Sequence, residues 1–229
     1  NEIPLSNFVK WEQSDKSEID LIQIFCNIEN AKQIPISEYK EIVLLLSDVL
    51  NSEPKFYQTF KYKDIDFGFI PKLDSISGGE FIDLENYMKE PDTWHKALSI
   101  LYRPITTRKK NWFDKEKHDL YDIEPYTESH DFFIDAPAEY YLGATVFFLQ
   151  FRERLIKRHD GLFTENFEET SQVEQNFNKK WNWYVSLRAL AELEHKRTNE
   201  ILEYPITEIY TLLEFEKDKA NVAKQMMKR

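Results

Sequence analysis

The residue types that most often perform acid–base chemistry or bind metal ions are widely separated in this chain of 229 residues. Two histidine–aspartate pairs, His118-Asp119 and His130-Asp131, lie close together in the sequence, within one segment that shows no regular pattern. If a loop brought these pairs together, they would offer the imidazole and carboxylate groups of a small hydrolase. No two histidines have the spacing of metal ligands on one helix face, however, and solvated loop residues are the favoured interpretation. The sequence therefore predicts no catalytic residue and no bound metal.

Other motifs that would bind a nucleotide or attack a substrate are incomplete. Gly78-Gly79 precedes a predicted helix, but Glu80 follows it and the lysine of a phosphate-binding loop is missing, so the pair indicates a flexible helix entry. The one cysteine, Cys26, has apolar neighbours and is predicted to be a small buried hydrophobe rather than a nucleophile. We therefore expect no cofactor and no enzymatic activity.

The net charge of −11 argues against general binding to nucleic acid, because an acidic surface repels phosphate groups. The basic cluster Arg108-Lys109-Lys110 precedes Trp112 and would suit binding to single-stranded nucleic acid. Acidic residues follow the cluster, however, and neutralise its charge. The chain has no apolar run of the roughly 18 residues that a membrane span requires, so no membrane association is expected. A single cysteine excludes an intramolecular disulfide framework, which suits a reducing compartment.

The elements that would position any functional residue are mainly helical. The most strongly patterned stretch, 67–105, is predicted to contain two short helices that are separated by Pro91 and ended by Pro104. Ser77 and Glu80 have the spacing of a capping box at the start of the first of these helices. Because each helix has one apolar stripe, the pair is expected to form the hub on which the flanking segments pack.

The segments around this hub have patterns of different kinds. Lys63-Asp64 lies between two apolar runs and predicts the turn of a β-hairpin near 56–70. From Thr106 to Ala136 no period is visible, and an irregular segment of this length inside a domain is often functional. Further helices are predicted at 5–12, 15–28, 37–51, 137–159, 171–192, 199–202 and from 206 onward.

Together these patterns predict a mainly α fold, a multi-helix globular bundle with one small β-hairpin. An N-terminal helical region, 1–136, includes the hairpin and the irregular segment, and a C-terminal helical region covers 137–229; the two are expected to form one compact unit. Helices 137–159 and 171–192 are predicted to pack on the helix pair at 78–103. This packing would bury the large aromatic side chains Trp94, Phe147, Phe148, Phe151 and Trp181.

Two segments are better suited to contact another chain than to fill this core. The terminal helix has an apolar stripe from Ile206 to Phe215, but from Glu216 it continues as a charged rod with few large apolar residues. The segment 106–136 is rich in aromatic residues that no periodic element explains. The predicted partner-binding residues are Tyr210, Leu213, Phe215 and Met226 on the helix, and Trp112, Phe132 and Phe133 in the aromatic segment.

Several stretches also resemble one protein family. The segment IDLIQIFCNIENAKQIPISEYKEIVLLLSDVL, residues 19–50, resembles the N-terminal region of tail assembly chaperones of tailed bacteriophages. FGFIPKLDSISGGEFIDLEN, WHKALSILYRPI and YDIEPY are similar to longer versions of these proteins from phages of Bacteroidota and marine bacteria. The C-terminal stretches WNWYVSLRALAELE and TLLEFEKDKANVAKQ are similar to the end of the same proteins. The shared motifs are short and structural, and none is catalytic.

The resemblance implies a non-enzymatic phage morphogenesis protein that shields the apolar tape-measure protein in the host cytoplasm during tail assembly. Its expected partner is the tape-measure protein or another tail or connector component, with self-association as a further mode of binding. This chain departs from the family in its aromatic segment 106–136 and in its phenylalanine-rich helix near 137–159. The alternative that these departures leave open is a structural virion protein, at the head–tail connector or inside the particle.

Overall fold

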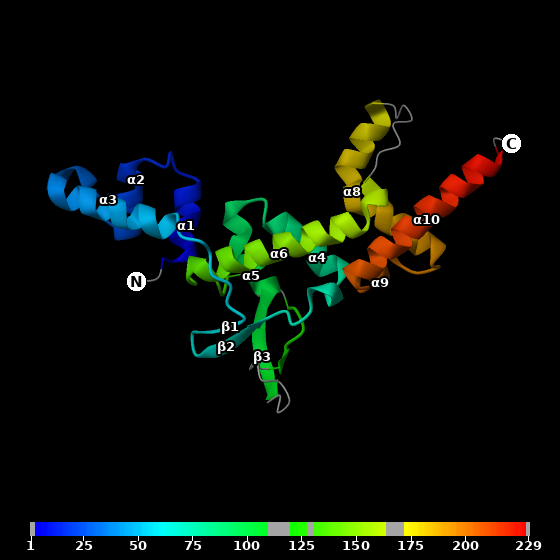
Figure 1. Cartoon of the computed structure of the whole chain (residues 1–229), viewed down its shortest axis with the longest axis horizontal. Coiled ribbons are helices and arrows are strands. Elements are labelled where there is room, and N and C mark those ends of the chain that lie inside the picture. Colours follow the sequence, from blue (N-terminus) through cyan, green and yellow to red (C-terminus); the bar gives the residue numbers. More distant parts are fainter. Residues whose placement is uncertain (1–2, 110–119, 128–130, 164–171, 228–229) are drawn as a thin grey trace. The chain divides into compact units, whose positions relative to one another are not determined.

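The computed structural model describes residues 3–109, 120–127, 131–163 and 172–227 (Figure 1). Two compact units make up the chain, and each is assembled from separate stretches of sequence. The first unit comprises Asn1–Pro71 and Leu84–Phe147, and the second comprises Lys72–Asp83 and Phe148–Arg229. Helices α4 (Gly78–Tyr87) and α6 (Ala138–Arg158) each contribute residues to both units.

The first unit begins with three helices. These are α1 (Leu5–Glu12), α2 (Glu18–Cys26) and α3 (Ile36–Leu50), with the single turn η1 (Ala31–Gln33) before the third. Helix α2 starts with a capping box, in which the Ser17 hydroxyl accepts from the Asp20 amide at 3.1 Å and the Asp20 carboxylate accepts from the Ser17 amide at 3.2 Å. Cys26, which the sequence predicts to be buried, is exposed at the other end of α2, so that prediction is wrong.

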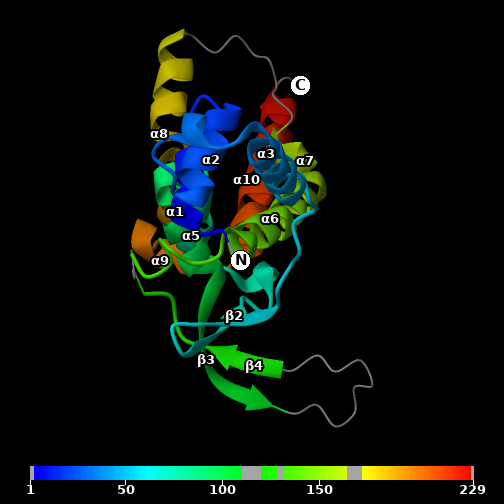
Figure 2. The same ribbon diagram turned by 90° about the vertical axis from the view of Figure 1, so that its left-hand side faces the viewer.

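A four-stranded antiparallel sheet follows, in the order β1-β2-β3-β4. Its strands are β1 (Thr59–Tyr62), β2 (Ile65–Phe69), β3 (Tyr102–Lys109) and β4 (Leu120–Ile123), and Figure 2 shows β3 beside β4. The predicted turn is confirmed, because Lys63 and Asp64 both have positive φ, as a tight two-residue hairpin requires. The predicted fold class is wrong in its β part: the protein is mainly α, but the hairpin is half of a larger sheet.

The sheet also corrects the prediction that 106–136 lacks regular structure. Strand β3 begins directly after helix α5 (Trp94–Leu101), which the single turn η3 (Pro91–Thr93) precedes, and it extends to Lys109. Pro104, expected only to end a helix, lies inside this strand opposite Phe67, and its carbonyl accepts from the Glu124 amide at 3.0 Å. A proline inside a central strand is unusual because it donates no ladder hydrogen bond, which is why the sequence pattern concealed the strand.

Tyr121 of β4 packs its side chain against β2. Its ring lies against Gly68, where an added Cβ would be 2.8 Å from Tyr121 Cδ2. Its hydroxyl donates to the carbonyl oxygens of Phe69, at 2.7 Å, and Gln58, at 3.1 Å. Gly68 therefore provides the space in which a buried tyrosine joins β4 to the first two strands.

Replacing Gly68 by valine is expected to displace the Tyr121 ring and lower the free energy of unfolding by about 2 kcal/mol, as overpacking typically does. Equilibrium urea unfolding followed by tyrosine and tryptophan fluorescence measures this change. The double variant Gly68→Val/Tyr121→Ala should lose less than the sum of the two single losses, because the clashing ring is removed. If the double variant is less stable than the wild type by the full sum of the single effects, the two residues do not interact in this way.

Aromatic side chains fill the first unit. Phe60 stacks on Tyr140 with ring centroids 3.9 Å apart, and Trp94 stacks on Tyr141 at 5.0 Å. Phe147 stacks on Phe56 at 4.7 Å but keeps 37% of its surface exposed, so its predicted burial is wrong. The buried side chains of this core include Phe60, Phe67, Phe69, Tyr102, Tyr121, Phe133 and Tyr141.

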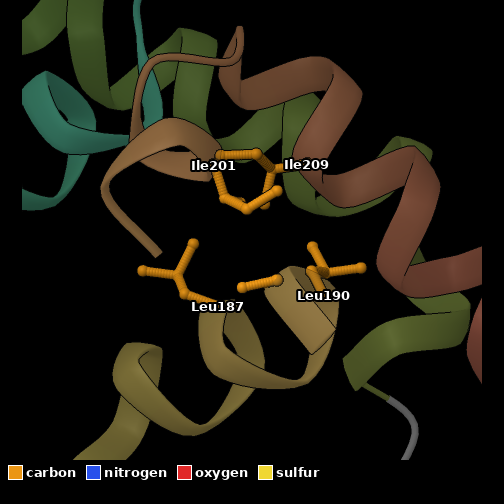
Figure 3. Packing of buried hydrophobic residues seen from close by; sticks show 5 residues of the cluster. Leu187, Leu190, Ile201 and Ile209 are labelled. Atoms are coloured by element: carbon orange, nitrogen blue, oxygen red, sulfur yellow. The ribbon is translucent and has the colours of Figure 1, made fainter. Parts of the chain in front are cut away.

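The second unit is built from helices around a small aliphatic core. Besides its parts of α4 and α6, it contains η2 (Leu73–Ser75), α7 (Asp160–Phe163), α8 (Gln172–Leu193), α9 (Thr198–Leu202) and α10 (Ile206–Met227). Pro205 separates the last two helices, as predicted. Figure 3 shows side chains of three helices converging in this core, which consists of Leu187, Leu190, Ala191, Ile201 and Ile209.

An early segment of the chain is incorporated in this unit by backbone hydrogen bonds. The Ile206 amide donates to the Ile76 carbonyl and the Gly78 amide donates to the Tyr204 carbonyl, both at 2.8 Å. A β-bridge joins Ser77 and Pro205 between them. The stretch before α4 is thus held to the connection between α9 and α10.

The predicted capping box of α4 is confirmed. The Ser77 amide donates to the Glu80 carboxylate at 3.0 Å, and the Glu80 amide donates to the Ser77 hydroxyl at 3.3 Å. Replacing Ser77 by alanine is expected to lower the free energy of unfolding by about 1 kcal/mol, the usual effect of losing a helix cap. Chemical denaturation measures it, and Ser77→Asp, which retains an acceptor, is the control that should lose clearly less.

The remaining predictions of aromatic burial divide. Phe148 and Phe151 are buried in the second unit, as predicted, and Trp94 is half-buried in the first. The predicted burial of Trp181 is wrong, since 41% of its surface is exposed on α8. An apolar stripe therefore identified the helices correctly but did not establish which aromatic residues face the core.

Candidate partner-binding surfaces

The predicted partner-binding residues of α10 fall into two groups. Tyr210 is buried, with its ring centroid 5.6 Å from that of Trp183, and Leu213 packs against the aliphatic core. Phe215 and Met226 are exposed over 61% and 72% of their surfaces. Tyr210 and Leu213 thus hold the helix in place, whereas Phe215 and Met226 offer apolar surface to a partner.

Polar contacts anchor α10 as far as Lys217. His159 Nδ1 and Glu214 Oε2 lie 2.6 Å apart, with the imidazole buried. Lys217 Nζ donates to the carbonyl oxygens of Gly161, at 2.5 Å, and Leu162, at 3.3 Å. These bonds satisfy carbonyl groups in the turn around α7, and they tie α10 to that turn.

Beyond this anchor, α10 presents a regular exposed stripe. Phe215, Lys219, Val222 and Met226 occupy positions i, i+4, i+7 and i+11 and therefore share one helix face. Between Lys219 and the end of the described helix at Met227, the charged residues are Lys219 and Lys224. The described end of α10 is consequently apolar and basic in a protein that is acidic overall.

In the first unit, the predicted residues Phe132 and Phe133 line an aromatic pocket. Phe133 is buried against Phe67, with ring centroids 4.9 Å apart, and Phe132 is half-buried. Trp112, the remaining predicted residue, lies outside the described residues. The pocket has a volume of about 180 Å³ and is lined by Ile65, Phe67, Ser99, Tyr102, Arg103, Pro104, Glu124, Pro125, Thr127, Phe132 and Phe133.

Basic side chains contact residues that line the aromatic pocket or lie next to them in the sequence. Arg103 Nε donates to the Ile100 carbonyl at 3.2 Å, and its guanidinium lies 5.8 Å from the centre of the Tyr126 ring. Lys63 Nζ donates to the Phe132 carbonyl at 3.3 Å and lies 4.9 Å from the centre of that ring. Ile65 of β2 also lines the pocket and is exposed over 40% of its surface.

Buried tyrosines make the first unit sensitive to alkaline pH. Burial raises the pKa of Tyr121 to about 12, and it raises the pKa of Tyr102, whose hydroxyl donates to the Tyr57 carbonyl, still further. The folded state therefore prefers the neutral phenol, so the stabilisation is complete below the unfolded pKa of 10.0 and is lost as the pH rises towards 12.

Urea unfolding at about pH 9 and about pH 11 should show a lower midpoint at the higher pH. Tyr121→Phe should reduce this difference, because phenylalanine has no proton to lose. An equal midpoint at both values would contradict the assigned burial of the phenols.

The exposed side of α3 is an apolar surface that the sequence prediction missed. Leu44 and Leu45 are exposed over 66% and 65% of their surfaces, and Ile36 and Val49 are exposed as well. Leu46 is the buried residue of this helix, and the sequence predicts no partner-binding residue at 37–51. The signal was present: three consecutive leucines, 44–46, span too wide an arc for one side of a helix to bury.

The described residues contain no group of three or more histidine, cysteine, aspartate or glutamate side chains that would hold a metal ion. His118 and His130 lie outside them, while Asp131 Oδ1 is 3.7 Å from His95 Nε2. No helix in this part of the chain combines the length and apolar character needed to cross a bilayer.

The described residues provide three candidate partner-binding surfaces: an aromatic pocket, an exposed apolar helix face on α3 and a basic apolar stripe on α10. Comparisons of the chain with protein-family models, with curated proteins and with solved structures found no match.

Proposed function

We propose that this chain is a non-enzymatic phage morphogenesis protein, a tail assembly chaperone that shields the apolar tape-measure protein in the host cytoplasm. The motif resemblance at 19–50 and in the later stretches supports the assignment to this family. The aromatic pocket is the observation that supports binding of an apolar partner. A chaperone of this kind must hold apolar side chains of a partner that has not yet assembled.

The size and lining of the aromatic pocket suit this task. An apolar cavity of about 150 Å³ binds a benzene molecule, so a pocket of about 180 Å³ accommodates one aromatic or branched aliphatic side chain. Phe67, Phe132 and Phe133 supply apolar walls, and the polar groups of Arg103 and Glu124 can bond the polar backbone of a bound segment. The pocket thus combines non-specific apolar contact with polar groups.

One pocket gives only weak binding, which is what a chaperone needs. Burying a single large apolar side chain contributes on the order of 1.5–3 kcal/mol, so a bound segment can be released when the tail assembles. A structural virion protein, the alternative, would keep such a surface covered in the finished particle. The two functions therefore differ in where the protein remains after assembly.

Mass spectrometry of purified phage particles and of infected-cell lysates separates these functions. A chaperone is abundant in the lysate and absent from the particles, whereas a virion protein is present in both. Stoichiometric amounts in particles that have been purified to constant density would overturn the chaperone proposal.

The aromatic pocket itself is tested by co-expression with the tape-measure protein of the same phage. Ile65→Glu places a charge in the lining of the pocket and is expected to reduce the soluble fraction of the tape-measure protein about tenfold. Leu193→Glu changes an apolar residue of similar exposure, 48% against 40% for Ile65, that does not line the pocket and lies on α8; it is the matched control. If both variants retain the soluble fraction, the pocket does not hold the partner.

A further inference from the structure

The exposed faces of α3 and α10 carry opposite charges around similar apolar centres. On α3, Glu41, Leu45 and Asp48 occupy positions i, i+4 and i+7, and all three are exposed. Leu44 and Val49 extend the apolar surface on either side of Leu45. The α3 face is therefore an apolar patch with a carboxylate one turn before its centre and another one turn after it.

The stripe on α10 has the complementary pattern. Val222 is its centre, with Met226 one turn later and Lys219 one turn earlier. The Lys219 side chain is 61% exposed. It contacts both carboxylate oxygens of the half-buried Glu216, at 3.1 and 3.2 Å, and such a pair at the surface competes only weakly with another carboxylate. The α10 stripe is thus an apolar patch with an ammonium group beside its centre.

The spacing of these residues makes the match independent of helix direction. If Leu45 faces Val222, Lys219 lies opposite Glu41 when the helices are parallel and opposite Asp48 when they are antiparallel. A carboxylate meets the ammonium group in both arrangements, and the leucine and methionine side chains cover the remaining apolar surface.

Pairing of like faces is less favourable. Two α3 helices that meet at Leu45 place Glu41 opposite either Glu41 or Asp48 of the other copy, and both arrangements bring carboxylates together. Two α10 stripes that meet at Val222 leave Lys219 facing another Lys219 or a methionine. Charge complementarity therefore selects α3 with α10 over α3 with α3 or α10 with α10.

We propose that α3 of one copy of this chain binds the C-terminal half of α10 of a second copy. This interface is heterologous, because the two copies contribute different surfaces, so a bound pair still presents one unused α10 on the first copy and one unused α3 on the second. Such a contact generates a ring if the rotation between copies closes and an open filament if it does not. The inference goes beyond the chaperone activity and does not use the aromatic pocket.

The experiment measures the molar mass of the purified full-length chain by sedimentation velocity over a range of concentrations. Four proteins are compared: wild type, Glu41→Lys/Asp48→Lys, Lys219→Glu, and the combined variant with all three changes. We expect the wild type to self-associate. The dissociation constant should rise about tenfold in each variant that reverses charge on one helix only, and the combined variant should recover the wild-type value. Circular dichroism establishes that the variants remain folded.

A matched control reverses two other exposed acidic residues, Glu53→Lys/Glu203→Lys, and should associate as the wild type does. It gives the same change in net charge, so it separates the interface from a general effect of charge. A wild type that stays monomeric over the whole concentration range overturns the proposal. The proposal is also overturned if Lys219→Glu weakens the association but Glu41→Lys/Asp48→Lys does not. That result would assign the contact to α10 alone.

Discussion

Replacing Phe148 by alanine is expected to lower the free energy of unfolding by about 3–5 kcal/mol. Only 1% of the Phe148 surface is exposed, and its ring lies 5.6 Å from that of Phe81 and 6.3 Å from that of Phe151. Alanine would remove the apolar contacts of a whole ring and leave a cavity that the helices on either side can close only in part. Equilibrium denaturation in urea, followed by circular dichroism, measures the loss.

Phe215→Ala is the matched control for this prediction. It removes the same atoms in the same unit from a side chain that is mostly exposed, so the expected loss is below about 1 kcal/mol. Both variants are compared at low protein concentration, so that association does not contribute. Equal losses at Phe148 and Phe215 would show that Phe148 is not part of the core.

The second large effect is expected at Gly143, in the part of α6 that belongs to the first unit. A Cβ atom there would be 2.7 Å from the carbonyl carbon of Lys55 and 3.1 Å from Cα of Phe56. These atoms belong to the backbone and cannot move aside as a flexible side chain does. Gly143→Ala should therefore lower the free energy of unfolding by about 3 kcal/mol, although alanine favours a helix by up to about 1 kcal/mol over glycine.

Gly79→Ala provides the comparison, because the same substitution in α4 meets no closer atom than the Leu202 carbonyl oxygen at 3.6 Å. There the helix preference of alanine should leave the stability unchanged or slightly increased. Thermal and urea unfolding of both variants show whether each substitution raises or lowers the free energy of unfolding. A stabilised Gly143→Ala variant would mean that the 55–56 backbone does not lie against α6.

Local signals in the sequence predicted local structure well. Ser77 and Glu80 form the capping box that their spacing indicated, and Lys63-Asp64 forms the hairpin turn. Pro205 separates the last two helices as expected. Each of these features depends on residues within a few positions of one another, so the sequence contains all the information that determines them.

Pairing over long distances was not visible in the same way. The four residues of β4 form too short a run to show a period of two, and β3 contains Pro104. Their pairing depends on tertiary contacts such as that of Tyr121 with Gly68, which no local pattern encodes. The fold class was therefore predicted correctly in its helices and wrongly in its sheet.

The candidate binding surfaces were predicted in part for a related reason. Periodicity shows that a helix is amphipathic, but it does not show how much of an apolar face another element covers. Leu213 and Phe215 lie two residues apart on α10, yet the first packs on the aliphatic core and the second is exposed. The α3 face was missed because the apolar residues of 37–51 predict a helix but not which of these residues another element covers.

The bridge between Ser77 and Pro205 has a consequence for the synthesis of the protein. Ile76 and Phe81 are buried in the second unit, but the residues that bond this stretch, 204–206, are translated much later. At about 5–20 residues per second, the ribosome exposes this apolar stretch for on the order of 10 s before its partners emerge. The nascent chain is consequently most vulnerable to aggregation in that interval, and a premature stop before residue 204 leaves the stretch permanently unpaired.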